Sequence, residues 1–256
     1  MAKDKPIKIN DKDEPQKTYV HIILDKSGSM SIIRSETVTH FNEQVQELQK
    51  KTTEGMDTLV SLTVFDSSVD HKFLRKPVKN LKELALDEYQ PCGTTALYDA
   101  IGFSLDDLSL AKDIKDENVA VLVVVLSDGA ENSSTTYRQA AIAGRIKELR
   151  ATGRYTFVYI GANQNLEEVS KRLSIPKTNM LRFASSASGV RGMSAAHVGS
   201  VGTYMISRSK GVLATHDFYS PDDQAKADLV PESKSSDPSP DAVKITSTTG
   251  SDPDGK

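Results

Sequence analysis

Apolar and polar residues alternate in blocks along this chain, and the blocks predict its secondary structure. Five blocks are short and rich in Val, Ile and Leu, a composition typical of strands buried on both faces of a sheet. A sixth block is extended but more polar and contains Pro77, which predicts a strand at a sheet edge. The five apolar blocks cover residues 19–24, 58–65, 119–126, 155–160 and 180–183, and the edge strand covers residues 69–78.

Between these blocks, apolar residues recur at spacings of three and four, which indicates amphipathic helices. The clearest example is residues 33–51, where Val38, Phe41, Val45 and Leu48 form one apolar face. Strands that alternate with helices favour an α/β fold, in which helices cover both faces of a mainly parallel sheet. The other helices are expected at residues 80–86, 96–110, 136–151, 166–173 and 189–209.

The two ends of the chain differ in composition from the part between them. Residues 1–17 mix lysines and acids with two prolines, which predicts a flexible arm. Residues 217–256 are rich in Pro, Ser and Asp without apolar periodicity, which predicts a disordered acidic tail. From residue 220 onward there are eight acidic residues and four lysines, whereas the whole chain has a net charge of −3. We therefore expect one domain over residues 18–216.

The composition also excludes several classes of protein. A net charge of −3 gives no general attraction to nucleic acid or to an anionic membrane. The single cysteine, Cys92, excludes an internal disulfide and a cysteine-based zinc cage. The first residues lack the apolar stretch of a secretory signal, and the longest apolar run is too short to span a bilayer. We therefore expect an intracellular, cytoplasmic protein with no nucleic-acid partner and no membrane insertion.

Candidate chemistry begins where the first strand ends. Asp25, Ser27 and Ser29 follow that strand at alternating positions, so a loop that curls over the strand end can turn three oxygen atoms toward one point. Binding groups of open α/β sheets collect at the carboxyl ends of central strands, and oxygen ligands suit Mg2+, Mn2+ or Ca2+. Asp and Ser are also common in turns, so this segment taken alone favours an ordinary polar turn.

Two further segments add to this picture. DKSGSM after the first strand, GTTALYDAI before a helix and LSDG after residues 119–126 together resemble the von Willebrand factor type A family, over residues 18–209. In that family the three segments form a metal-ion-dependent adhesion site. The resemblance implies a Rossmann-like, three-layer α/β/α fold, with a mainly parallel sheet of about six strands and one antiparallel edge strand. It also leads us to expect a stand-alone member of bacterial or phage type, associated with the virion or the host cytoplasm if a phage encodes it.

The same resemblance assigns metal ligands to individual positions. Thr95 is the expected ligand of the middle segment, because Thr94 stands where the family usually has a second glycine. The implied roles are hydroxyl ligands for the serines and the threonine, and direct or water-mediated binding for the aspartates. Thr94 and Asp99 are expected at most in a supporting position, and Asp99 is also explained as a first-turn acid favoured by the helix dipole. The implied ligands are Asp25, Ser27, Ser29, Thr95 and Asp128.

A divalent ion held in this way keeps one position open, and in the family this position takes an Asp or Glu of a protein partner. We therefore expect a non-enzymatic binding module that uses Mg2+, with Mn2+ or Ca2+ as alternatives. One alternative is a structural subunit or ATPase-associated helper with a stabilising ion. Another is a phosphatase-like enzyme with Asp25 as nucleophile, which would need a second acid where Ser27 stands. We expect Lys26 to be solvated, and the acidic tail is a candidate for self-association through the metal site.

Overall fold

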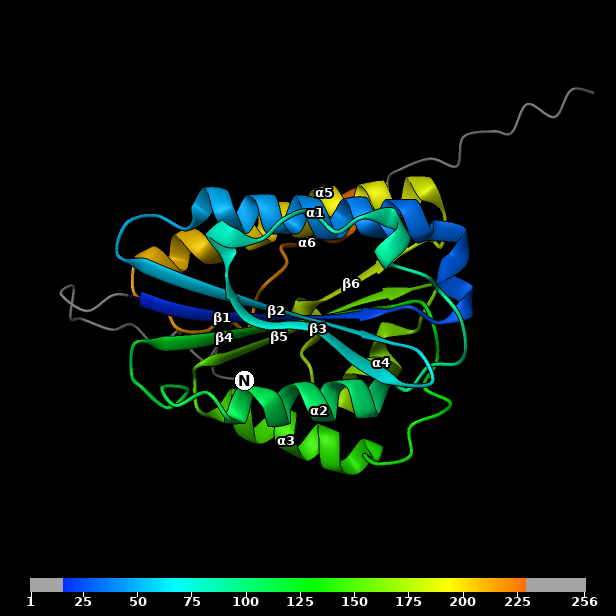
Figure 1. Ribbon diagram of the computed structural model, residues 1–256, viewed down its shortest axis with the longest axis horizontal. Coiled ribbons are helices and arrows are strands. Elements are labelled where there is room, and N and C mark those ends of the chain that lie inside the picture. The colour runs from blue at the N-terminus through cyan, green and yellow to red at the C-terminus, as the bar shows by residue number, and fades with distance from the viewer. Residues whose placement is uncertain (1–15, 229–256) are drawn as a thin grey trace, which may run out of the picture.

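A six-stranded sheet forms the centre of the computed structural model, which describes residues 16–228. The strand order is β3-β2-β1-β4-β5-β6, with β3 antiparallel to β2 and all other neighbours parallel. The carboxyl ends of the five parallel strands therefore lie at one end of the molecule (Figure 1). This confirms the expected sheet with one antiparallel edge. The strands are β1 (Gln16–Asp25), β2 (Met56–Phe65), β3 (Val69–Pro77), β4 (Val119–Ser127), β5 (Tyr155–Ala162) and β6 (Met180–Phe183).

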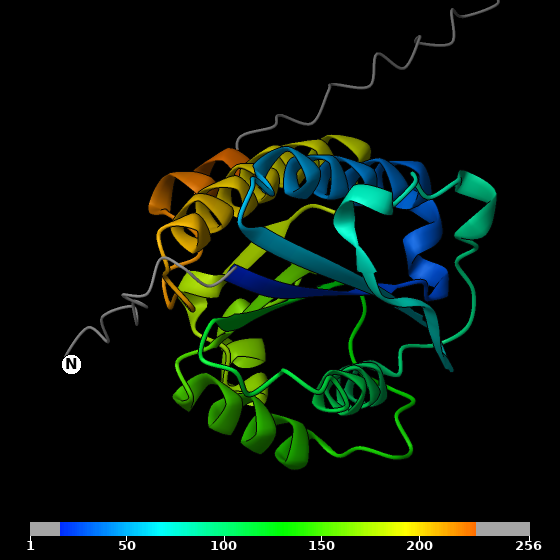
Figure 2. The same ribbon diagram turned by 60° about the vertical axis from the view of Figure 1, so that its left-hand side comes forward.

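Helices cover both faces of the sheet and give the molecule three layers (Figures 1 and 2). One layer contains α1 (Arg34–Lys51), α5 (Ala187–Ser209) and α6 (Pro221–Asp228). The opposite layer contains α2 (Leu97–Ser109), α3 (Gln139–Ala151) and α4 (Leu166–Leu173). No helix within residues 16–228 is long and apolar enough to cross a membrane. Short 3-10 turns complete the fold: η1 (Gly28–Ile33), η2 (Val78–Asn80), η3 (Leu86–Glu88) and η4 (Lys177–Asn179).

The alternation of side chains along each strand divides the core into two halves. Val20, Ile22 and Leu24 of β1 pack in the half that contains α1 and α5, whereas Tyr19 and Ile23 pack in the half that contains α2 and α3. All nine residues of β4 are buried, as its uniformly apolar sequence predicts. The fold class expected from the sequence is confirmed.

The short helix expected at residues 80–86 is wrong. The Asn42 side chain of α1 instead accepts a 2.8 Å hydrogen bond from the Leu84 N–H and donates a 3.1 Å bond to the Leu84 carbonyl. Gln49 donates to the carbonyls of Val78 and Leu81. Because α1 side chains satisfy this backbone, the segment follows α1 as a loop with two 3-10 turns.

The boundaries expected at the two ends of the domain also need correction. β1 begins at Gln16, so the last two residues of the expected arm belong to the sheet. Residues 217–228 belong to the domain rather than to a disordered tail, because Phe218 and Tyr219 are buried and α6 follows them. The remaining parts of both expected segments, residues 1–15 and 229–256, lie outside the described residues.

α6 also covers the outer edge of β6. The Gln224 side-chain amide accepts a hydrogen bond from the Arg182 N–H and donates one to the Arg182 carbonyl, both at 3.2 Å. The amide therefore bonds the edge strand as the backbone of a further strand would.

Candidate functional site

The candidate site begins with two neighbouring strand ends. β1 and β4 are parallel with Leu24 opposite Leu126, so Asp25 and Ser127 end their strands side by side. The Ser127 hydroxyl donates a 2.6 Å hydrogen bond to Asp25 Oδ2, and the Ser27 N–H donates a 2.7 Å bond to Asp25 Oδ1. Asp25 has no exposed surface. Its carboxylate is thus fixed from both sides at the base of the site.

The two serines connect this buried carboxylate to the surface. The hydroxyl oxygens of Ser27 and Ser29 lie 3.2 Å apart, and the Ser29 hydroxyl donates a 2.7 Å bond to Asp128 Oδ1. Ser27 is buried, Asp128 is half-buried and Ser29 is exposed. Hydrogen bonds therefore join four of the five expected residues from the core to solvent.

Thr95 completes the group from the loop before α2. It is buried, and a Cβ atom placed on Gly129 would lie only 2.7 Å from Thr95 Oγ1. The Thr95 hydroxyl therefore packs against the backbone that directly follows Asp128. The Gly28 N–H also donates a 3.1 Å bond to the Gly93 carbonyl, which ties the serine loop to the threonine loop. All five expected residues thus lie at the end of the sheet where the parallel strands terminate.

The two residues expected in a supporting position lie differently. The Asp99 carboxylate accepts hydrogen bonds from the N–H groups of Thr135, Thr136 and Tyr137 at 2.8, 3.0 and 2.7 Å. Its oxygens therefore hold this backbone segment rather than the candidate site. Thr94 is exposed on the loop before Thr95.

The carboxylates of the site have unusual electrostatics. Burial raises the pKa of Asp25 to about 6, against the hydrogen bonds from Ser127 and Ser27, and the charge of Asp128 adds to the rise. Burial also raises the pKa of Asp128, against the hydrogen bond from Ser29. Among residues 16–228, no lysine or arginine is among the main groups that shift the pKa of either carboxylate. The site therefore carries negative charge without a compensating cation.

Lys26 lies beside the site in sequence but forms an ion pair with Asp66, so the expectation that it is solvated is wrong. Although burial raises the pKa of Asp66, hydrogen bonds from Lys26, Ser68 and Cys92 bring it down to about 2. The Lys26 charge is therefore paired with Asp66.

Sequence reasoning missed three contributors to the site. Ser127 belongs to the LSDG segment, and its signal was a hydroxyl at the end of a strand next to β1. Tyr89 is fully buried and donates its hydroxyl to the Asp25 carbonyl. Asn132 accepts a 2.9 Å bond from the Thr95 N–H. The sequence carries no periodic signal for Tyr89 or Asn132, because both lie in irregular segments.

The chemistry of this donor set fits a hard divalent cation. The described residues contain no group of three or more His, Cys, Asp or Glu suited to a metal, so any ion here depends on hydroxyl ligands as well as on the two carboxylates. Hydroxyl and carboxylate oxygens are the ligands that Mg2+, Mn2+ and Ca2+ prefer. The uncompensated charge of Asp25 and Asp128 favours a cation at the same place.

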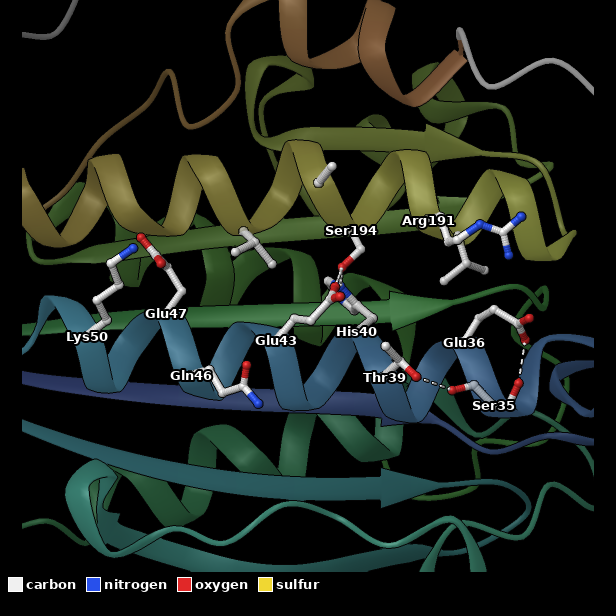
Figure 3. A pocket seen from close by; sticks show the side chains of 13 residues that line it. Ser35, Glu36, Thr39, His40, Glu43, Gln46, Glu47, Lys50, Arg191 and Ser194 are labelled. Atoms are coloured by element: carbon white, nitrogen blue, oxygen red, sulfur yellow. Dashed lines mark hydrogen bonds between the residues drawn. The ribbon is translucent and has the colours of Figure 1, made fainter.

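A separate groove of about 700 Å3 lies between α1 and α5 (Figure 3). Ser194 of α5 donates a hydrogen bond to Glu43 and lies 2.8 Å from His40 Nδ1, so these polar groups join the two helices. Burial lowers the pKa of His40 to about 4, which keeps it neutral near pH 7. None of the five candidate ligands lines this groove.

Comparisons with known proteins concern the family and the fold of the chain. A family model described as von Willebrand factor type A domain matches residues 20–193. A comparison with curated protein sequences gives no match.

Solved structures share the fold at low sequence identity. The von Willebrand factor domain of the type V pili tip protein Mfa5 from Porphyromonas gingivalis is similar with a TM-score of 0.54 and 10% identity, over 77% of this chain and 97% of that chain. Proximal thread matrix protein 1 from the mussel byssus is similar with a TM-score of 0.50 and 17% identity, over 81% of this chain and 48% of that chain. A von Willebrand factor type A protein from Catenulispora acidiphila gives a TM-score of 0.50 and 15% identity, over 73% of this chain and 43% of that chain. This chain thus spans about half the length of the byssus protein.

Proposed function

Since the chain belongs to the von Willebrand factor type A family, whose members usually mediate protein interactions and often bind a divalent metal, we propose that it binds a protein partner through a divalent cation. We take Mg2+ as the first candidate, with Mn2+ and Ca2+ as alternatives. The observation that carries the proposal is a pair of carboxylates, one of them fully buried, without a neighbouring positive charge that lowers their pKa. They lie with three hydroxyl groups at the carboxyl ends of the central strands. The proposed ligands are Asp25, Ser27, Ser29, Thr95 and Asp128.

Each residue of the set has a distinct part in this proposal. Asp25 is held by Ser127 and by the Ser27 backbone, so its charge stays in place below the surface. Ser29 and Asp128 are the members of the set that reach solvent, and a partner would therefore approach from their side. When bound, the cation supplies positive charge and an open position for an Asp or Glu of the partner.

The geometry argues against Asp25 as an enzymatic nucleophile. Both of its carboxylate oxygens accept hydrogen bonds, and the residue has no exposed surface for an incoming substrate. Ser27 also occupies the position where such chemistry needs a second acid. We therefore propose binding rather than catalysis.

Calorimetric titration of the full chain with MnCl2 and with MgCl2 tests the cation site. We expect saturable binding by the wild type, weakened by about tenfold or more in Asp25→Asn and Thr95→Ala. A wild-type chain that binds neither ion would overturn the proposal.

A pull-down with the wild type and with Asp25→Asn, each in Mg2+ and in chelator, tests the partner. We expect an interacting protein that the wild type retains only in Mg2+ and that Asp25→Asn does not retain. If Mg2+ stabilises the wild type against heat but no captured protein depends on Mg2+, the ion is structural and the chain is better described as a subunit of a larger assembly.

A further inference from the structure

The helix that follows Thr95 begins without a capping side chain of its own. The residue before α2 is Ala96, which offers no hydrogen-bond acceptor on its side chain. Two of the first N–H groups of α2 are satisfied from another part of the chain. The Tyr98 N–H donates to Glu131 Oε2 at 2.9 Å, and the Asp99 N–H donates to Ser134 Oγ at 3.1 Å. The segment after β4 therefore caps α2.

α2 in turn binds the backbone of the segment that follows β4. The Asp99 carboxylate, on the first turn of α2, accepts the N–H groups of residues 135–137. Glu131 additionally accepts the N–H groups of Ser133 and Ser134 at 3.0 and 2.7 Å, which fixes the turn from which it caps the helix. The start of α2 and residues 131–137 thus form one interlocked unit.

Asn132 connects this unit directly to a candidate metal ligand. Its side-chain Oδ1 accepts a 2.9 Å bond from the Thr95 N–H, and its own N–H donates a 3.1 Å bond to the Thr95 carbonyl. Both polar groups of the Thr95 backbone are therefore held by one residue. Asn132 also lies four positions after Asp128, so it links the loops that carry two of the proposed ligands.

We propose that Asn132 is a positioning residue of the cation site, which sets the Thr95 hydroxyl relative to Asp128. This inference rests on the proposed cation binding. The Thr95 hydroxyl lies close to Gly129, because a Cβ atom placed on Gly129 would be 2.7 Å from Thr95 Oγ1. A shift of the Thr95 backbone would therefore change the position of this hydroxyl relative to the loop that carries Asp128. Loss of a group that orients a metal ligand typically weakens metal affinity by about 10–100-fold.

Mn2+ titration of the full chain tests the role of Asn132. We expect Asn132→Ala to weaken Mn2+ binding by about tenfold, because it removes the acceptor for the Thr95 N–H. Asn132→Asp keeps an acceptor oxygen in the same place, and we expect it to bind at least as tightly as the wild type. Asn132→Gln moves the oxygen by one methylene, and we expect it to bind as weakly as the alanine variant. The glutamine variant also serves if the alanine variant does not fold.

Asn42→Ala is the matched control. Asn42 also forms hydrogen bonds with both the N–H and the carbonyl of one residue, Leu84. It lies on α1 and not at the Thr95 loop. We expect this variant to lose thermal stability in chelator and to keep wild-type Mn2+ affinity, whereas Asn132→Ala loses affinity. Wild-type affinity in both Asn132→Ala and Asn132→Gln would overturn the inference. A wild type that binds neither Mn2+ nor Mg2+ would instead overturn the proposed function.

Discussion

The Ser29 hydroxyl donates a 2.7 Å hydrogen bond to Asp128 Oδ1, although the two residues are 99 positions apart in the chain. The bond joins the loop after β1 to the loop after β4. It lies at the surface, where water can replace it, so it adds little to stability. Its importance is that it brings a hydroxyl and a carboxylate together at the solvent side of a buried acid.

Removal of this hydroxyl is expected to affect ion binding more than folding. We predict that Ser29→Ala weakens Mg2+ and Mn2+ binding by about tenfold and changes the free energy of unfolding in chelator by less than about 1 kcal/mol. Calorimetric titration and urea unfolding measure the two quantities. Ser31→Ala is the control, because Ser31 is exposed on the same turn and its hydroxyl donates to the Gly28 carbonyl. Equal affinities of the two variants would contradict the assignment of Ser29.

The raised pKa of Asp25 predicts a pH dependence for the metal-free protein. The folded state holds a proton on Asp25 up to about pH 6, whereas the unfolded chain releases it near 3.8. The contribution of Asp25 to stability therefore falls as the pH rises from about 4 to about 6 and stays low above that, a change of about 2–3 kcal/mol. We predict that the wild type becomes less stable relative to Asp25→Asn as the pH rises over this range. Urea unfolding in metal-free buffer measures this difference.

Saturating Mg2+ should reverse this trend, because ion binding requires the ionised carboxylate. The stabilisation of the wild type by Mg2+ should therefore increase as the pH rises through about 6. A stabilisation that is the same at about pH 5 and about pH 7.5 would show that Asp25 is not coupled to the ion.

Gly129 leaves the space that the Thr95 hydroxyl occupies. In Gly129→Ala, the new Cβ would lie 2.7 Å from Thr95 Oγ1 and 3.3 Å from its Cγ2, so Thr95 must move. We predict weaker Mn2+ binding, by about tenfold, in a protein that still folds. Gly144→Ala is the control, since no atom lies within 4 Å of a Cβ at that position. Wild-type affinity in Gly129→Ala would contradict the placement of Thr95.

Arg208 holds the opposite end of the sheet. This fully buried guanidinium donates to the carbonyls of Lys17, Asn118 and Val212 and to the Thr18 hydroxyl. Arg208→Ala would leave several buried acceptors without partners, and we predict a loss of about 3 kcal/mol or more in the free energy of unfolding. Ion affinity should not change in the fraction that remains folded. Urea unfolding and Mn2+ titration together separate this structural role from a role at the site.

Truncations locate the C-terminal boundary of the domain. A chain that ends at residue 216 loses Phe218, whose ring packs against His197, Tyr204 and Tyr219. We predict a loss of about 3 kcal/mol or more, as for other large aromatic side chains removed from a core. A chain that ends at residue 228 should fold as the full chain does. If it also keeps the ion affinity and self-association of the full chain, the expected role of the acidic tail is wrong.

The parts of the fold that followed strong local patterns were predictable. The buried strands carry continuous runs of β-branched residues, and α1 carries a clear apolar face, so their positions were confirmed within a few residues. α3 begins at Gln139 rather than at residue 136, and the N–H groups of Thr136 and Tyr137 before it donate to Asp99 of α2. α6 was missed because it is short and mostly polar, and the large buried residues nearby, Phe218 and Tyr219, lie before the helix without periodicity.

The candidate site was likewise predictable only in part. Asp25, Ser27 and Ser29 were predictable as oxygen-bearing side chains that follow a buried strand, and motif resemblance supplied Thr95 and Asp128. The partners that hold these residues were not predictable, because Tyr89 and Asn132 reach them from irregular loops. Such contacts depend on tertiary packing, which leaves no spacing in the sequence.

The contact between Gln224 and the backbone of Arg182 has a consequence for crowded solutions. A sheet with an open border invites strands from other molecules, and such pairing can propagate into fibres. Here the Gln224 side chain bonds the backbone of the edge strand β6. The opposite edge strand, β3, contains several charged residues and pairs with β2 in an irregular register. Both outer strands of the sheet thus disfavour pairing with a second molecule, and the proposed cation site lies at the ends of the central strands β1 and β4, away from both.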